Sequence, residues 1–153
     1  FSWLEYNLAK VEVVGSNPIY RSMKIIIAGS RNFNNYELLV KKCKAVLKNV
    51  NNIEIVHGCA KGADLLGERF AKENNLIYHG FPANWYDLNV TPCKIKKDKN
   101  GKEYNALAGH NRNKKMALFS DALIAFWDGK STGTKNMIEE AKKLDLQVRI
   151  VKY

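Results

Sequence analysis

Short aliphatic runs alternate with amphipathic segments from Met23 onward, and this alternation predicts a parallel β-sheet covered by helices on both faces. Residues 24–28 are nearly all aliphatic, as expected for a strand buried on both sides. Further strands are predicted at 53–57, 76–80, 122–127 and 146–151. Helical spacing of apolar residues predicts helices at about 36–48, after Asp64, at 107–119 and after Thr134. We therefore expect one Rossmann-like α/β domain with a mainly parallel five-stranded sheet.

The start of the first helix has a capping signal. Asn34 stands three residues before Glu37, which is the spacing of a capping box. We therefore expect Asn34 to cap this helix.

Residues 1–22 do not share the strand and helix pattern. Their charges cancel, and residues 14–18, Val-Gly-Ser-Asn-Pro, are what the common T-arm sequence of transfer RNA genes encodes. We expect residues 1–22 to be a leader outside the fold, either disordered or translated from upstream of a natural start at Met23. The domain is then expected to span residues 23–153.

Residues 82–106 form an irregular, basic insertion in this pattern. Asn100-Gly101 predicts the tip of a hairpin or loop, and lysines flank it at Lys94, Lys96, Lys97, Lys99 and Lys102. A charged loop tip usually keeps a protein soluble, but these lysines are also candidate contacts for nucleic acid. Trp85 and Tyr86 have three open interpretations, which are stacking on a base, core packing and a lid contact.

Composition fits one compact domain of 153 residues, with 46% hydrophobic and 26% charged residues. No apolar run approaches the roughly 20 residues that cross a bilayer, so no membrane contact is expected. The three cysteines are scattered without metal-ligand spacing, which favours reduced thiols in the cytoplasm and no metal site. The net charge of +10 favours polyanions or phosphorylated ligands as partners.

Three segments rich in small and polar residues follow predicted strands. In an open parallel sheet, ligands bind beyond the carboxyl ends of the strands, where helix N-termini attract anions. The candidate ligand-binding residues in these segments are Gly29, Ser30, Arg31, Gly58, Ala60, Gly62, Asp64, Asp128, Gly129, Ser131, Gly133 and Thr134. Arg112 and Asn113, near the start of the third predicted core helix, are expected to reach the same edge.

Several of these residues also have ordinary structural interpretations. Asp64 is expected to cap the next helix rather than to accept a ribose hydroxyl. His57 is expected to be a strand-end histidine, because spacing names no partner for it. Neither a Walker A motif nor GxGxxG is present, which disfavours a P-loop kinase or an NAD dehydrogenase.

Four segments together resemble the SLOG superfamily of Rossmann-like proteins, which includes the DprA and LOG proteins. They are Ile-Ile-Ala-Gly-Ser-Arg at 26–31, His-Gly-Cys-Ala-Lys-Gly-Ala-Asp at 57–64, Asn-Arg-Asn at 111–113 with Met116, and residues 128–134. The chain most closely resembles the small YspA/YpsA-like branch of bacteria and phages. The resemblance implies a pocket for a nucleotide or nucleotide-derived ligand. The residues that it implies as the lining are Gly29, Ser30, Arg31, Gly58, Gly62, Asp64, Arg112, Gly129, Ser131, Gly133 and Thr134.

The LOG enzymes, which cleave the N-glycosidic bond of nucleoside monophosphates, carry Pro-Gly-Gly-x-Gly-Thr-x-x-Glu at the last of these turns. This chain keeps Gly133-Thr134, but Met137 stands at the position of the catalytic Glu. A thioether cannot transfer protons, so the resemblance favours binding or sensing over catalysis.

Two other functions remain open. A hydrolase acting on an N-glycosidic or phosphate bond would use Asp64 or Asp128 as its carboxylate, and a phosphate-bound Mg²⁺ is compatible with either ligand-binding function. DprA-like binding of single-stranded nucleic acid would use the lysine loop at 94–102. Self-association into a homo-oligomer is also open by analogy with related folds.

Overall fold

The computed structural model describes residues 13–14, 17–18 and 21–153. Strands β1 (Val13–Val14) and β2 (Asn17–Pro18) pair antiparallel. The expectation that residues 1–22 form a leader falls mostly on residues 1–12, 15–16 and 19–20, which lie outside this description. No helix among the described residues is both long enough and apolar enough to span a membrane.

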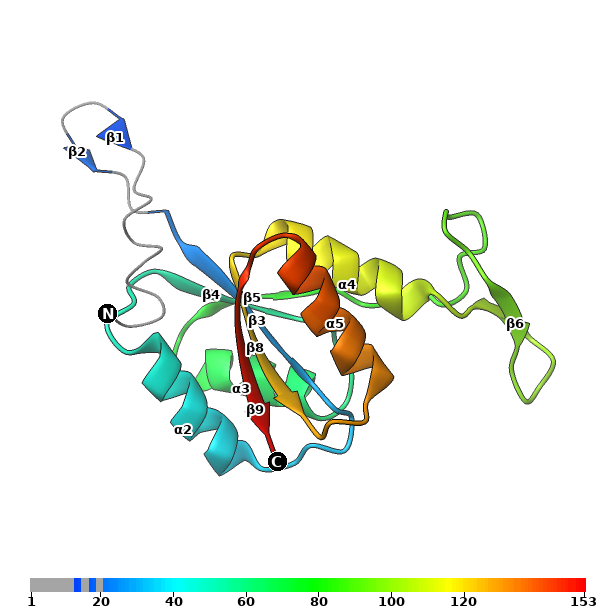
Figure 1. Cartoon of the computed structure of the whole chain (residues 1–153), viewed down its shortest axis with the longest axis horizontal. Helices are drawn as coiled ribbons and strands as arrows, with labels where there is room; N and C mark the ends of the chain where they lie inside the picture. The colour runs from blue at the N-terminus through cyan, green and yellow to red at the C-terminus, as the bar shows by residue number, and fades with distance from the viewer. Residues whose placement is uncertain (1–12, 15–16, 19–20) are drawn as a thin grey trace.

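Five parallel strands form the central sheet, which confirms the predicted fold class (Figure 1). In sheet order they are β5 (Ile77–Gly80), β4 (Ile53–His57), β3 (Met23–Gly29), β8 (Ala122–Trp127) and β9 (Gln147–Lys152). From β3 the chain first builds outward through β4 to β5. It then crosses back to pair β8 with the other side of β3, so the direction of winding reverses between β3 and β8.

Helices cover both faces of this sheet (Figure 1). Helices α2 (Tyr36–Leu47) and α3 (Ala63–Glu73) cover one face. Helices α4 (Ala108–Phe119) and α5 (Thr132–Lys143) cover the other. Because the two pairs lie on opposite faces, neither pair covers the carboxyl edge at the reversal between β3 and β8.

The core consists of two apolar layers separated by the sheet. Ile25 and Ile27 of β3 are buried in the layer beneath α2 and α3, whereas Ile26 and Ala28 are buried in the layer beneath α4 and α5. Successive strand residues point to opposite faces, so a strand covered on both sides needs apolar residues at every position. This explains the continuous aliphatic run of residues 25–28.

The capping prediction for α2 is wrong by one residue. Asn35 is the N-cap, and its side chain accepts a hydrogen bond from the N–H of Leu38 at 3.0 Å. Two adjacent asparagines offer the same capping group, and the sequence alone does not decide which one adopts the cap conformation.

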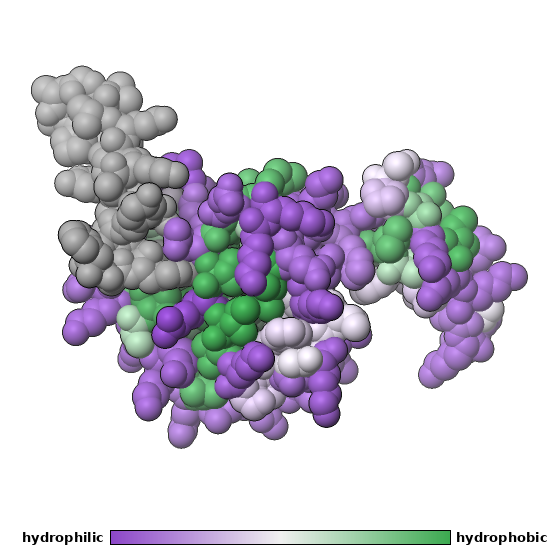
Figure 2. Space-filling view, in the orientation of Figure 1, coloured by the Kyte–Doolittle hydropathy of each residue, from purple (hydrophilic) through white to green (hydrophobic). Residues whose placement is uncertain are grey.

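The insertion at residues 82–106, here called the arm, projects from the body of the domain (Figure 1). Its strands β6 (Ile95–Lys97) and β7 (Glu103–Asn105) form the predicted antiparallel hairpin. Gly101 in the connecting turn has a φ of +80°, a conformation that favours glycine. Figure 2 shows apolar residues in the middle of the arm and hydrophilic residues along its outer rim.

Gly29→Ala is expected to lower the free energy of unfolding by roughly 1–3 kcal/mol, because overpacking displaces backbone. A Cβ at Gly29 would lie 2.3 Å from the backbone oxygen of Phe126 and 2.7 Å from Cβ of Ala63. Denaturant unfolding measures the change. Gly133→Ala is the control, since its Cβ meets no atom within 4 Å. Equal stability of the two variants would contradict the role given to Gly29.

Candidate functional site

A cavity of about 700 Å³ opens at the carboxyl ends of β3 and β8. Its walls come from the turn after β3, the loop and first turn leading into α5, the first turns of α4, and the base of the arm. This is the point where the winding of the sheet reverses, which is the usual ligand site in open α/β sheets.

Most of the residues that the sequence singles out lie around this one cavity. The lining includes Gly29, Ser30, Arg31, Ala60, Asp64, Arg112, Asn113, Asp128, Ser131, Gly133 and Thr134. It also includes residues that the candidate set did not contain, namely Ala28, Asn32, Trp85, Ala106, Gly109, His110, Met116, Lys130, Thr132 and Met137. Gly58, Gly62 and Gly129 are not in the lining.

Two of these three glycines have packing roles instead. A Cβ at Gly58 would lie 2.5 Å from the Arg112 guanidinium, and one at Gly62 would lie 2.4 Å from the backbone oxygen of Ser30. Both glycines therefore let neighbouring loops approach one another closely. Their close approach to a ligand stays a prediction, because neither glycine lines the cavity and the contacts that they make are within the protein.

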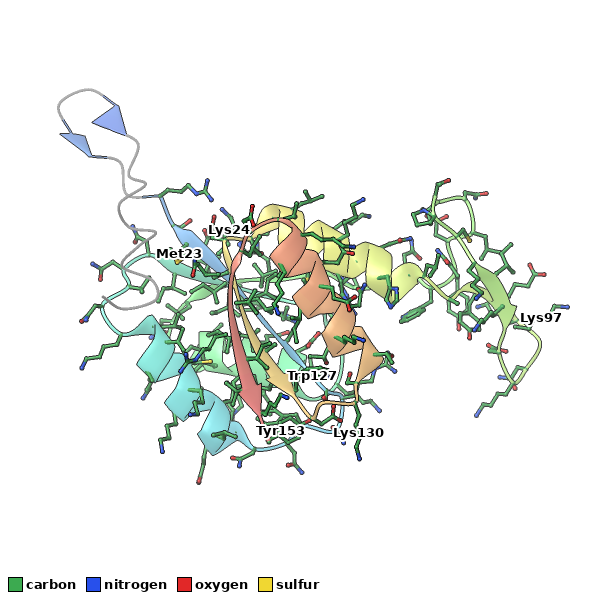
Figure 3. The ribbon with its side chains drawn as sticks, viewed as in Figure 1. Met23, Lys24, Lys97, Trp127, Lys130 and Tyr153 are labelled. Atoms are coloured by element: carbon green, nitrogen blue, oxygen red, sulfur yellow. The ribbon has the colours of Figure 1, made fainter. Side chains whose placement is uncertain are left out.

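The loop between β8 and α5 is organised by Asp128. Its Oδ1 accepts hydrogen bonds from the N–H groups of Lys130 at 2.9 Å and Ser131 at 2.8 Å. These bonds hold the pKa of the Asp128 carboxyl below its usual range. Trp127 supports the loop from behind, because its indole N–H donates to the backbone oxygen of Ser131 at 3.0 Å. Figure 3 shows Trp127 and Lys130 near this end of β8.

Helix α5 presents two backbone donors at the cavity. Its N-cap is Ser131, whose Oγ accepts a hydrogen bond from the N–H of Thr134 at 3.3 Å. The N–H groups of Thr132 and Gly133 have no intrahelical acceptor, because they belong to the first turn. Both residues line the cavity, and the space beside Gly133 is open. Such a helix start favours an anion.

Ser30 adds a buried hydroxyl close to the Asp128 carboxyl, and this hydroxyl also helps to lower the pKa of that carboxyl. The residue is 2% exposed, and its Oγ has no hydrogen-bond partner within the described part of the chain. An unsatisfied buried polar group costs about 1–3 kcal/mol, so a ligand that bonds to it gains affinity. Arg31, which follows it, is exposed and also lines the cavity.

Asp64 binds the loop before its helix rather than capping the helix itself. Its Oδ2 accepts hydrogen bonds from the N–H groups of Gly58 at 3.0 Å and Ala60 at 3.3 Å, and α3 has no side-chain cap. The predicted capping of α3 is therefore wrong. Burial raises the pKa of Asp64 to about 6, although the Arg112 guanidinium and the backbone N–H groups oppose this rise.

Arg112 and Asn113 hold the cavity walls together. Arg112 Nη1 donates to the backbone oxygens of Gly58 and Phe81, the residues that follow β4 and β5. Burial lowers the pKa of this guanidinium. Asn113 Nδ2 donates to the backbone oxygen of Gly133 at 3.2 Å, which joins α4 to the first turn of α5. Both side chains line the cavity, but these donors are used within the protein.

His57 has a partner that spacing did not reveal. Its Nε2 lies 3.1 Å from Oε2 of Glu68 on α3, and its Nδ1 accepts the N–H of Cys59 at 3.2 Å. Burial lowers the pKa of the imidazole. His57 is not in the cavity lining, and no group of three or more potential metal-ligating side chains occurs among the described residues.

The base of the arm supplies the remaining wall. Trp85 lies close to Gly109 of α4, where an added Cβ would be 3.3 Å from the indole. The backbone oxygen of Trp85 accepts the N–H of Asn105 at 2.7 Å. Asn105 is fully buried, and its Oδ1 accepts the N–H groups of Lys94 and Leu107, each at 3.0 Å. The arm is therefore tied to α4 at the edge of the cavity.

Two solved structures share this fold with the chain. DNA processing protein A from Streptococcus pneumoniae has a TM-score of 0.63 and 20% identity over 86% of this chain and 51% of its own. The protein of the same name from Helicobacter pylori, described with its single-stranded DNA binding mode, has a TM-score of 0.60 and 18% identity. That match covers 86% of this chain and 66% of the other. The chain thus spans about half to two thirds of the length of these relatives.

The family comparison agrees with the resemblance seen in the sequence. No curated protein matches the chain. The model of the YspA, cpYpsA-related SLOG family matches residues 23–87. These residues contain β3, β4, β5 and the two glycine-rich turns that follow β3 and β4. Residues 23–87 are therefore similar to the YspA, cpYpsA-related SLOG family, and the fold that the chain shares with the two DNA processing proteins agrees with this similarity.

Proposed function

We propose that this protein binds a nucleotide or nucleotide-derived ligand in the cavity between β3 and β8, with a phosphate at the start of α5. The observation that carries this proposal is the convergence of unused donors on one cavity. The Ser30 hydroxyl is buried without a partner, and the N–H groups of Thr132 and Gly133 have no intrahelical acceptor.

The charge around the cavity supports an anionic ligand. Arg31 and Lys130 are both exposed and both line it, and the chain carries a net charge of +10. A cavity of about 700 Å³ also falls within the range that holds small molecules and cofactors. The similarity of residues 23–87 to the SLOG family and the DNA ligand of the H. pylori relative support the same ligand chemistry.

The walls suggest an orientation for the ligand. With the phosphate at α5, the indole of Trp85 offers an aromatic surface for a base at the other side of the cavity. Asp128 uses Oδ1 for the loop and has the Ser30 hydroxyl close by, so we place a ribose hydroxyl rather than a phosphate at its second oxygen. An anion next to Asp128 would be repelled, so this carboxylate favours a neutral hydroxyl at that position.

We propose binding rather than bond cleavage. Met137 lines the cavity at the position of the LOG glutamate, and it is 1% exposed. Asp64 accepts two backbone N–H groups and lies against Arg112, so its carboxylate has a structural task. Asp128 alone does not provide the two carboxyl groups that glycosidic cleavage ordinarily uses.

Substitution of the anion site tests the proposal. Binding of AMP and, separately, of ADP-ribose is measured by thermal shift. A ligand at a hundred times its Kd raises the free energy of unfolding by about 2.7 kcal/mol, so it also raises the melting temperature. Arg31→Ala is expected to weaken binding roughly 10- to 100-fold, since a hydrogen bond to a charged group contributes about 1.5–3 kcal/mol. Gly133→Asp is expected to abolish binding through charge repulsion.

The control for Arg31→Ala is Arg149→Ala, which removes the same charge from an exposed position on β9 outside the cavity. This variant is expected to bind as the unmodified protein does. Unchanged calorimetric affinity in both Arg31→Ala and Gly133→Asp would exclude this site.

Asp64 predicts a pH dependence of stability. Its folded pKa of about 6 lies above its ordinary value of 3.8, so its contribution to stability is present below pH 3.8 and is lost as pH rises through 6. Asp64→Asn lacks this titration. Relative to that variant, the unmodified protein is expected to lose roughly 3 kcal/mol of unfolding free energy between pH 3.5 and 7.5. Denaturant unfolding at several pH values measures this difference, and parallel pH profiles would contradict it.

A further inference from the structure

The two faces of the β6–β7 hairpin differ in chemistry. In the strand register, Lys96 lies opposite Tyr104 and Lys97 lies opposite Glu103. Directly opposite residues share a face, and successive residues alternate between faces. Lys96 and Tyr104 therefore lie on one face, and Lys97 and Glu103 lie on the other. In Figure 3, Lys97 points away from the arm.

The hydrogen-bond ladder extends the first face in both directions. The N–H of Ala106 donates to the backbone oxygen of Lys94 at 2.8 Å, and that of Asp98 donates to the oxygen of Lys102 at 2.9 Å. By the same alternation, Lys94 and Lys102 lie on the side of Lys96. We call Lys94, Lys96, Lys102 and Tyr104 the lysine–aromatic face.

One acidic residue of the arm, Asp98, lies on this face with the three lysines, so the face keeps a net positive charge. Glu103 lies on the opposite side of the hairpin. Asp98 lies opposite Lys102, and its Oδ1 accepts the N–H groups of Asn100 at 2.8 Å and Lys102 at 3.0 Å, so its charge offsets one of the three lysines. Asp87 likewise accepts the N–H of Asn89 at 3.0 Å. The exposed lysines of the face are left to contact anions from solution.

Aromatic rings connect this face to the cavity. The ring of Tyr104 lies edge-on to Trp85, with centroids 6.5 Å apart, and Trp85 lines the cavity. Lys102 Nζ lies 3.7 Å from the centroid of the Tyr86 ring, and Tyr86 remains 56% exposed. Lysines and aromatic rings thus continue outward from the cavity wall along one side of the arm.

We propose that the lysine–aromatic face of the arm binds single-stranded nucleic acid. The phosphates contact Lys94, Lys96 and Lys102, and a base stacks on Tyr86. Alternating cations and aromatic rings are the combination that binds single strands without sequence preference. A terminal nucleotide of the same strand would then lie in the cavity, and this part of the proposal rests on the proposed function. The contact with the arm does not rest on it.

A single strand fits this surface better than a duplex or an acidic protein. Bases in a duplex are stacked on one another, so their faces do not reach Tyr86. An acidic protein would use the lysines but would leave the exposed ring unpartnered. The arm also stands clear of the body of the domain, so a flexible strand reaches it freely (Figure 1).

Fluorescence anisotropy with a labelled twelve-nucleotide oligo(dT) tests the proposal on the full chain. The double variant Lys96→Gln, Lys102→Gln is expected to bind about tenfold more weakly at low salt. Its log–log dependence on salt is expected to be shallower by about 1.4, since each phosphate contact on a single strand contributes about 0.7. Tyr86→Leu is expected to weaken binding about tenfold through lost stacking.

The matched control is Lys97→Gln, Lys99→Gln, which removes two charges from the opposite face and the tip of the same hairpin. This variant is expected to stay within about twofold of the unmodified protein. An equal loss in both double variants would overturn the proposal, because binding would then follow total charge. Absence of oligo(dT) binding, or an affinity that Tyr86→Leu does not change, would also overturn it.

AMP binding separates this proposal from the proposed function. The two double variants are expected to bind AMP as the unmodified protein does, because none of their lysines lines the cavity. Gly133→Asp is expected to lose AMP while retaining arm-dependent binding of oligo(dT). If AMP does not bind any variant but the lysine–aromatic face still determines oligo(dT) affinity, the proposed function fails and the arm proposal stands.

Discussion

The close pairing of β3 with β8 is the constraint on which the other features depend. The backbone at Gly29 lies so near Phe126 that no side chain fits between them. Because the chain winds away from this pair in both directions, α2 and α3 cover one face and α4 and α5 cover the other. The cavity is the space left at the carboxyl edge of the pair. A ligand bound there contacts segments that lie far apart in the sequence but are joined through two central strands.

Helix α4 holds this edge together with side chains that bind protein rather than ligand. Arg112 joins the ends of β4 and β5, and Asn113 fixes the first turn of α5. Asp64 orders the loop after β4 in the same way. Polar residues around a site thus divide into those that shape it and those with free donors, such as Ser30. Preorganised walls of this kind reduce the entropy that a ligand loses on binding.

The sequence predicted the strands well because burial on both faces favours short runs rich in aliphatic residues between turn-forming ones. The predicted bounds of β4 and β8 match the structure. The roles of Gly58 and Gly62 were not predictable, since a sequence shows that a side chain is missing but not which neighbour needs the space. The pairing of His57 with Glu68 was also missed, because it depends on how α3 packs against β4.

The arm leaves and rejoins the domain at neighbouring points, since the backbones of Trp85 and Asn105 are hydrogen-bonded to each other. The intervening residues 86–104 therefore form a closed excursion whose two ends are fixed independently of its length. We therefore expect insertions and deletions between those ends to leave the sheet and its helices in place, so that a change of recognition outside the cavity does not require a change of the domain that carries it.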